Sequence, residues 1–273
     1  MITLLENNSK VLISRKGAYV ESLIINGINI LKETNDNIEP HGGLSILIPY
    51  ADIVSKATYK FNGKQYLLPK NAGYEGDLIN SMHGLTLDQT WKVITKSDKK
   101  IDFQVILNEN FYPSKLLIDV IYMIDNAKFS VDYSIKNIGD KSCPIMCGAH
   151  PYFIFSDYWK FEFHDAAVQL KRYNTKSITT QRITDTISNV PNKLYDNAYF
   201  GGGIVDFYTK YLKMEIIRYN MPFFEIYNGT YAGQNSVAFE PLTGAPNCFN
   251  NGMGLKTLKQ NDKFECGFSC SLL

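Results

Sequence analysis

Apolar and polar residues alternate along several segments of this chain, and this alternation constrains the fold more than any other feature. In residues 128–138, KFSVDYSIKNI, every second side chain is apolar, and residues 211–219, YLKMEIIRY, follow the same pattern. Successive side chains of a β-strand point to opposite faces, so both segments are predicted to be half-buried strands. Residues 115–124, KLLIDVIYMI, form a more continuous apolar run. That run predicts a strand covered on both faces.

Asn-Gly pairs lie between strand-like arms in three places, residues 23–31, 59–68 and 223–231. Asn and Gly tolerate the positive φ angles of a tight hairpin, so these pairs predict antiparallel turns. No segment carries a long, capped apolar stripe at helical spacing. The sequence therefore predicts an all-β, antiparallel protein with about two short helices or helical turns.

The length and charge of the chain narrow the classes of partner. Its 273 residues suit one β-rich domain spanning 1–273. With 28 basic and 27 acidic residues the net charge is +1, so nothing favours a nucleic-acid partner. The N-terminus lacks the features of a signal peptide, and no apolar run approaches the ~20 residues that span a bilayer. We expect a cytoplasmic protein that does not bind membranes.

Cysteine usage and glycine runs give no cofactor signal. The five cysteines include no Cys-x-x-Cys motif, and no His lies at ligand spacing from any pair of them. Cys266 and Cys270 are predicted to share one face of a strand as small buried groups. The run Gly201–Gly203 is not followed by a helix pattern, so it predicts a turn and not a phosphate-binding loop. We expect neither a metal nor another cofactor.

Titratable residues interrupt four otherwise apolar or aromatic stretches. They are His83 in SMHGLTLDQTW, His150 in CGAHPYF, Asp196 in NKLYDNAYF and Glu240 in VAFEPLTGAPN. Alternation around Glu240 places it on the strand face opposite Val237 and Phe239, at the rim of a sheet. Taken alone, a satisfied core histidine and a solvent-facing glutamate are the commoner interpretations of such residues.

Six motifs occur in the order found in the aldose 1-epimerase (galactose mutarotase) family, which this chain resembles over most of its length. They are GGLSILIPYADI, YKFNGKQYLLPKN, HGLTLDQTW, GAHPYF, YDNAY and FEPLTGAPNCFNNGMGL. The resemblance implies a large twisted antiparallel β-sandwich with few short helices. It also implies a sugar-binding cleft across the concave face of one sheet.

The resemblance also implies roles for individual residues. Glu240 stands at the position of the base that takes the proton from the anomeric hydroxyl, and His150 at that of the acid that protonates the ring oxygen. His83 and Asp196 stand at positions of substrate contacts. An unperturbed carboxylate (pKa ~4.3) and imidazole (pKa ~6.5) suit these two roles near neutral pH. Trp91 is predicted to pack in the core.

Two departures from the family pattern bear on substrate binding. Asp52 and Ile53 stand where the family has Asn-Arg, so an arginine that contacts the sugar is missing. Lys56 and Arg172 are the candidate replacements. Glu225 stands where the family commonly has Gln, and close to Glu240 it would raise the pKa of one of the two carboxyls. Asp52 and Glu225 join His83 and Asp196 as predicted substrate-binding residues.

The expected activity is the interconversion of the α and β anomers of a free aldose, by a monomer or homodimer with a small-molecule sugar as its partner. Two alternatives on the same fold stay open, a hexose-phosphate mutarotase and a non-catalytic sugar-binding protein. Paired carboxylates also leave a glycosidase open. His41, in a predicted loop, and His164, in a strand-like segment, have no comparable support as site residues.

Overall fold

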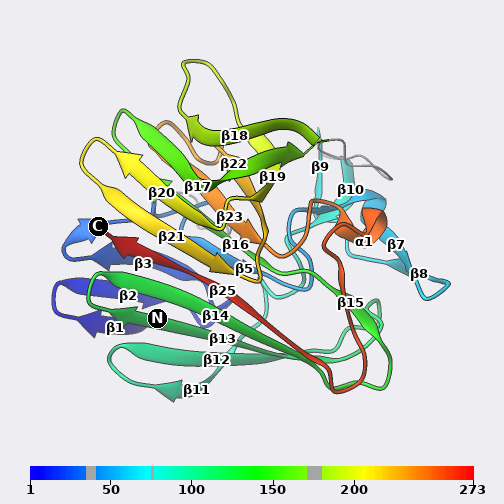
Figure 1. Cartoon of the computed structure of the whole chain (residues 1–273). Helices are drawn as coiled ribbons and strands as arrows, with labels where there is room; N and C mark the ends of the chain where they lie inside the picture. The colour runs from blue at the N-terminus through cyan, green and yellow to red at the C-terminus, as the bar shows by residue number, and fades with distance from the viewer. Residues whose placement is uncertain (35–40, 75–76, 171–179) are drawn as a thin grey trace.

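The computed structural model describes residues 1–34, 41–74, 77–170 and 180–273. Its described part is built almost entirely of antiparallel strands, with two short helical elements, η1 (Ser55–Ala57) and α1 (Cys248–Asn251). The all-β prediction is therefore confirmed, including its two short helical turns. In the described ranges, eighteen strands form one large sheet that curls back over itself (Figure 1).

One half of this sheet, which we call half A, lies at the front of the view in Figure 1. Neighbouring strands follow one another in an order that differs from the chain order. They are β11 (Lys92–Lys96), β12 (Lys100–Leu107), β13 (Leu116–Asp125), β14 (Lys128–Asn137), β25 (Lys263–Leu272), β21 (Lys213–Tyr219) and β20 (Ile204–Thr209).

The other half, half B, carries the predicted site residues of the large sheet. Its strands are β18 (Thr180–Ser188), β19 (Asp196–Gly201), β22 (Phe223–Tyr227), β23 (Ser236–Leu242), β16 (Gly148–Ile154), β5 (Leu44–Leu47), β3 (Val20–Ile25), β4 (Ile28–Asn29), β2 (Ser9–Ile13) and β1 (Ile2–Glu6). The long strand β17 (Trp159–Leu170) joins the halves, because its first residues pair with β20 and its last with β19.

Three smaller sheets flank the large one. They are β6 (Ile53–Val54) with β9 (Ala72–Tyr74) and β10 (Asp77–Met82), β7 (Thr58–Phe61) with β8 (Lys64–Leu67), and β15 (Cys143–Ile145) with β24 (Lys256–Leu258). The β6–β10 pair matters for function because His83 follows β10 directly.

The main core lies between the two halves. The rings of Phe153 on β16 and Phe207 on β20 are 5.5 Å apart, and the Tyr133 hydroxyl of β14 donates to the carbonyl of Gly148. Alternate residues of β14 are buried, as predicted. The prediction for β13 is wrong, because its buried residues also alternate with more exposed ones. The outer face of β13 is only partly covered, and its apolar composition reflects strand propensity there rather than full burial.

Two of the three Asn-Gly predictions are confirmed as tight hairpins. Asn26 and Gly27 have φ angles of 50° and 80° between paired residues of β3 and β4, and Asn62–Gly63 does the same between β7 and β8. The third pair opens a longer connection, residues 228–235, between β22 and β23. Gly229 is needed there for a close approach, since a Cβ atom would lie 2.6 Å from the ring of Tyr227.

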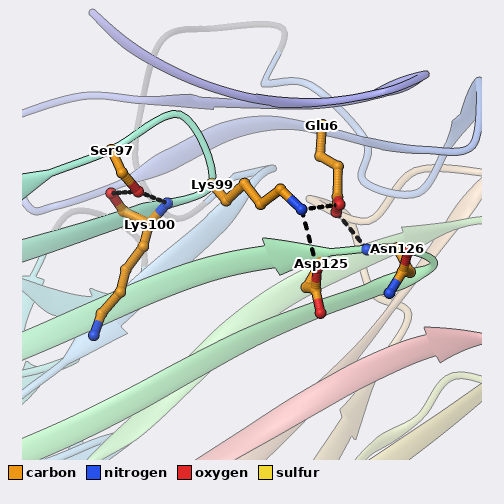
Figure 2. Close-up of polar contacts among 6 residues, drawn as sticks. All are labelled: Glu6, Ser97, Lys99, Lys100, Asp125 and Asn126. Atoms are coloured by element: carbon orange, nitrogen blue, oxygen red, sulfur yellow. Dashed lines mark hydrogen bonds and ion pairs between the residues drawn. The ribbon is translucent and has the colours of Figure 1, made fainter.

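A polar cluster ties the edge strand β1 of half B to the hairpin turns of half A (Figure 2). Lys99, in the turn between β11 and β12, binds the Glu6 carboxylate and lies 3.3 Å from Asp125. Glu6 also accepts a hydrogen bond from the backbone N–H of Asn126. The Glu6 side chain is almost fully buried, so these two donors compensate the loss of its hydration.

The five cysteines are free thiols buried in the structure, which agrees with the prediction that Cys266 and Cys270 are small buried groups. Trp91 is fully buried, as predicted, and Gly201–Gly203 form the turn between β19 and β20. No helix in the described residues is both long enough and apolar enough to cross a membrane.

Candidate active site

Strand register brings His150, Glu240 and Glu225 into one row across half B. Glu225 on β22 is the register partner of Glu240 on β23. The pairs Gly148–Leu242 and Tyr152–Ala238 flank His150, so His150 on β16 lies opposite Glu240 on its other side. Directly opposed residues of antiparallel strands have their Cβ atoms about 4.5–5.5 Å apart and point to the same face.

This row lies on the face of half B that points away from the main core. Phe224, Val237 and Phe239, which alternate with the two glutamates, belong to the main core. Tyr152 and Ala238, two residues from His150 and Glu240, belong instead to a small separate cluster with Ala232. The strand phase predicted around Glu240 is therefore confirmed.

His150 and Glu240 are in direct contact. Nε2 of His150 lies 3.2 Å from Oε1 of Glu240, and the two residues are 4% and 3% exposed. The predicted place of Glu240 at the rim of a sheet is wrong, because β23 continues to Leu242 and is buried along its whole length. Both common interpretations fail as well, since the glutamate is not solvent-facing and the histidine is outside the core.

The surroundings of His150 disfavour a charged imidazole. Burial lowers the pKa of His150 well below its ordinary value, and the imidazoles of His83 and His41 lower it further. Its ring also stacks on Tyr152, with centroids 4.6 Å apart. An imidazolium formed at this position is therefore a stronger acid than a solvated one.

His83 approaches His150 from the segment after β10. The two rings meet edge to face with centroids 5.4 Å apart. The backbone N–H of His83 donates to the carbonyl of Asp52, which is itself buried just before β6. Gly84 permits the sharp turn, because its φ is +85° and a Cβ atom would lie 2.3 Å from the carbonyl oxygen of Ile48.

Asp196 lies at the start of β19, as the register partner of Tyr227 on β22. Asp196 is exposed. Glu225, two residues before Tyr227 on β22 and in the row of His150 and Glu240, is only 2% exposed. Tyr227 links the two rows, since its ring meets both His150 and Tyr152 edge to face at 6.3 and 6.4 Å. The structure thus brings five predicted residues, His83, His150, Asp196, Glu225 and Glu240, to one region, with the backbone of Asp52 bound to His83.

A family model described as aldose 1-epimerase matches residues 1–269 of the chain. The chain belongs to the aldose 1-epimerase family. It is similar to the uncharacterized protein YihR of Escherichia coli K12, with 22% identity over 268 residues that cover 89% of this chain and 83% of that protein.

Solved structures of galactose mutarotase-like and galactose 1-epimerase proteins share the fold of this chain. A galactose mutarotase-like protein from Lactobacillus casei has a TM-score of 0.84 and 17% identity, with full coverage of both chains. Galactose 1-epimerase from Lactobacillus acidophilus has a TM-score of 0.72 and 17% identity, covering 99% of this chain and 93% of its own. The predicted galactose mutarotase-like β-sandwich is confirmed by these similarities.

Sequence reasoning missed three residues beside the site of this family member, His41, Lys32 and Tyr231. The rings of His41 and Tyr231 stack with centroids 3.7 Å apart, and the charge of His41 acts on His150. The Lys32 ammonium donates to the carbonyls of Tyr231 (2.6 Å) and Ala232 (3.3 Å) and lies 6.0 Å from the ring centroid of Tyr152. These contacts join segments about 200 residues apart, for which alternation gives no signal.

Neither candidate replacement for the missing arginine is brought to the site by a described contact. Lys56 is exposed on η1, and its backbone N–H donates to Asn80. Arg172 lies outside the described residues. Ile53, at the position of the arginine, is buried in β6.

One group of side chains in the described residues has the composition of a metal site, but it lies in another part of the sheet. His164, Asp206 and Glu215 have ligand atoms within 4.8 Å of one another. The Lys213 ammonium is already 3.3 Å from Asp206, and this cation opposes a metal ion there. Two cavities, of about 510 and 540 Å³, are lined by none of the six predicted site residues.

Proposed function

We propose that this protein is an aldose 1-epimerase that interconverts the α and β anomers of a free sugar by opening and reclosing its ring. One observation carries the proposal, namely the contact between a buried imidazole and a buried carboxylate on the outer face of half B. A structural pair of this kind is costly to bury, and a binding site alone has no need of it.

The proton balance of the reaction matches the pair. Glu240 takes the proton of the anomeric hydroxyl, the bond between C1 and the ring oxygen breaks, and His150 gives a proton to that oxygen. The product is the open-chain aldehyde, which rotates about its first carbon–carbon bond and recloses with both transfers reversed. The two sugar oxygens are bonded to the same carbon, so two groups 3.2 Å apart can each come within about 2.6–3.2 Å of one of them.

The low pKa of His150 affects this chemistry in two ways. The imidazolium is less populated at neutral pH, which lowers the fraction of ready enzyme. Once formed beside the Glu240 carboxylate, it transfers its proton more readily to a weakly basic ether oxygen. Each positioned acid or base contributes roughly 10²–10⁴ to the rate of such reactions.

The remaining candidates are proposed to bind the sugar. His83 lies against the acid, Glu225 lies in the same row as His150 and Glu240, and Asp196 lies in the next row of the sheet. Asp52 supports His83 through its backbone carbonyl. We further expect a cytoplasmic monomer or homodimer whose partner is a small-molecule sugar, with no resident cofactor.

The alternatives predict different substrates. A hexose-phosphate mutarotase requires cations that clamp the phosphate, and the described cation beside the site, Lys32, is committed to two backbone carbonyls. A non-catalytic module would bind a sugar without exchanging its anomers. A glycosidase would use the opposed carboxylates of Glu225 and Glu240 to cleave a glycosidic bond.

Polarimetry on freshly dissolved α-glucose, α-galactose and α-xylose tests the proposal. The wild-type protein should accelerate the approach to anomeric equilibrium for at least one sugar, and Glu240→Gln and His150→Asn should each abolish most of the acceleration. Glucose 6-phosphate and methyl glycosides serve as comparison substrates for the alternatives. No acceleration with any free sugar would refute the proposal, and sugar-dependent shifts in the protein's NMR signals would then support the binding module.

A further inference from the structure

Arg218 is a buried cation inside the main core. Strand β21 alternates buried and more exposed residues, and the alternation turns Arg218 inward, where it is 7% exposed. Its Nη1 donates to the carbonyls of Met221 (3.0 Å) and Phe223 (2.9 Å). Its Nη2 donates to the carbonyls of Gly201 (2.7 Å) and Gly202. Four bonds therefore hold the guanidinium plane in one orientation.

The guanidinium lies behind the carboxylate pair of the site. Its Cζ atom is 4.8 Å from the ring centroid of Phe224 and 5.5 Å from that of Phe239. Glu225 and Glu240 follow these two phenylalanines in the sequence and project from the opposite face of half B. One layer of strands thus separates the cation from the two carboxylates.

Within the described residues, no interior anion matches the charge of Arg218. Its hydrogen-bond partners are all backbone carbonyls, no carboxylate of the described residues forms an ion pair with it, and its Nε has no hydrogen-bond partner. Burial lowers the pKa of Arg218 to about 9, so it stays charged at neutral pH. Asp165 and Lys256 share the cavity that Arg218 lines.

A buried charge is expensive, and the four carbonyl bonds only partly offset its lost hydration. An apolar side chain would serve the packing between Phe224 and Phe239 at lower cost. Glu225 and Glu240, opposed in register and buried on the other face of the same strands, have the complementary need, because like charges repel each other.

We propose that Arg218 is a positioning residue for the reaction, whose charge, acting through the β22–β23 layer, keeps the Glu225–Glu240 pair ionised. The inference rests on the proposed function, in which Glu240 acts as the base. Other titratable groups face the pair from the described elements around it, namely His150 and Tyr152 on β16, Tyr227 on β22, Asp196 on β19 and His83 after β10. Arg218 acts from the opposite side of the strands from all of these.

The expected effect is a shift in titration. Two charges on opposite faces of one layer of strands, at an effective dielectric of about 20, change each other's pKa by about one unit. Loss of the cation raises the pKa of Glu240, so less of the base is ionised in acid. In a variant without this charge, the acid limb of the kcat/KM pH profile should therefore shift by about one unit to higher pH. The kcat/KM value on the plateau at higher pH should change much less.

Three variants separate charge from packing. Arg218→Lys keeps the charge and loses most of the carbonyl bonds, Arg218→Gln keeps amide donors and loses the charge, and Arg218→Met loses both. The pH–rate profile should shift in the Gln and Met variants and stay near wild type in the Lys variant, even though all three lower the melting temperature. Arg15→Gln, which removes an arginine bound to the carbonyl of Trp91, is the control and should shift nothing.

A second readout keeps this test independent of activity. Titration of ¹³C-labelled glutamate side chains by NMR reports the two carboxyls directly, using Glu225→Gln and Glu240→Gln to assign them. Raised midpoints in Arg218→Gln, with near-wild-type midpoints in Arg218→Lys, support the inference even if no sugar is turned over. Unchanged midpoints in Arg218→Gln, or equal shifts in the Lys and Gln variants, would overturn it and leave Arg218 as a structural clamp.

Discussion

The His150 imidazole and the Glu240 carboxylate lie 3.2 Å apart on adjacent strands, both almost completely shielded from solvent. Their register across β16 and β23 fixes this pairing without help from a loop. Rigid strands hold catalytic groups more precisely than loops do, because neighbouring hydrogen bonds restrain the backbone on both sides. The predictions below follow from this pair and from the residues packed around it.

The acid and the base are expected to work as a unit. Glu240→Gln and His150→Asn should each lower kcat by about 10²–10⁴, and the double variant should be little worse than the poorer single variant. The reason is that neither proton transfer proceeds usefully without the other. Additive losses in a double-mutant cycle would show that the two groups act in separate steps.

The lowered pKa of His150 predicts that folding stability depends on pH. In the unfolded chain this histidine titrates near its ordinary pKa of ~6.5, whereas in the folded protein it resists protonation. The unfolded state therefore binds more protons below that pH, and stability should fall by up to about 1.4 kcal/mol per pH unit as the pH drops from ~6.5 toward the folded-state pKa.

Urea unfolding between pH 7.5 and 5 measures this dependence. The slope should be smaller in His150→Asn than in the wild type. His164→Asn is the control, because its side chain is 46% exposed. Parallel curves for the wild type and His150→Asn would contradict the linkage.

Glu225 is predicted to affect the pKa of the proposed base, Glu240. Its carboxylate is opposed to that of Glu240, so removing its charge with Glu225→Gln should lower the pKa of Glu240 and move the acid limb of kcat/KM to lower pH, by about one unit. A Glu225→Asp variant keeps the charge and should move the limb less. An acid limb that stays in place in Glu225→Gln would show that the two carboxyls titrate independently.

Gly229 is predicted to keep the Tyr227 ring in contact with His150. A Cβ atom at this position would lie 2.6 Å from the Tyr227 ring, which itself contacts His150. Gly229→Ala should therefore displace Tyr227, cost about 1–3 kcal/mol of stability and raise KM. Gly203→Ala is the matched control, since no atom lies within 4 Å of its new Cβ and its φ is not in the left-handed region. Equal melting temperatures for the two variants would refute the prediction.

Glu6 is predicted to secure the contact between the sheet halves. Glu6→Ala leaves the N–H of Asn126 without its acceptor and should cost about 1–3 kcal/mol. Glu162→Ala removes a partly exposed ion pair with Lys160 and should cost less than about 1 kcal/mol. Chemical denaturation of both variants tests the difference, and a Glu6 effect no larger than that of Glu162 would contradict it.

Alternation in the sequence predicted much of what positions the site. The phase of β23 separated Glu240 from Val237 and Phe239, because a two-residue period follows directly from strand geometry. The continuous apolar run of β13 misled the prediction, because some of its apolar residues occupy a partly exposed face. Composition reports strand propensity and burial together, and only the neighbouring strands decide between them.

The rest of the site depends on contacts that have no local signature. His41 contacts Tyr231, and Lys32 contacts the same loop, across about 200 residues of the chain. The buried position of Glu240 also depends on β16 and β22 lying on either side of β23. Strand order in a sheet of this kind follows from tertiary packing, so a single sequence does not reveal which titratable residues become neighbours.

The most direct test of the central claim is two-dimensional exchange NMR on sugars at anomeric equilibrium. Cross-peaks between the α and β anomeric protons should grow much faster with wild-type protein than in buffer, and with the double variant Glu240→Gln, His150→Asn they should grow at the buffer rate. Exchange that stays at the buffer rate with the wild-type protein, or that survives in the double variant, would contradict the assignment of this pair as the acid and base.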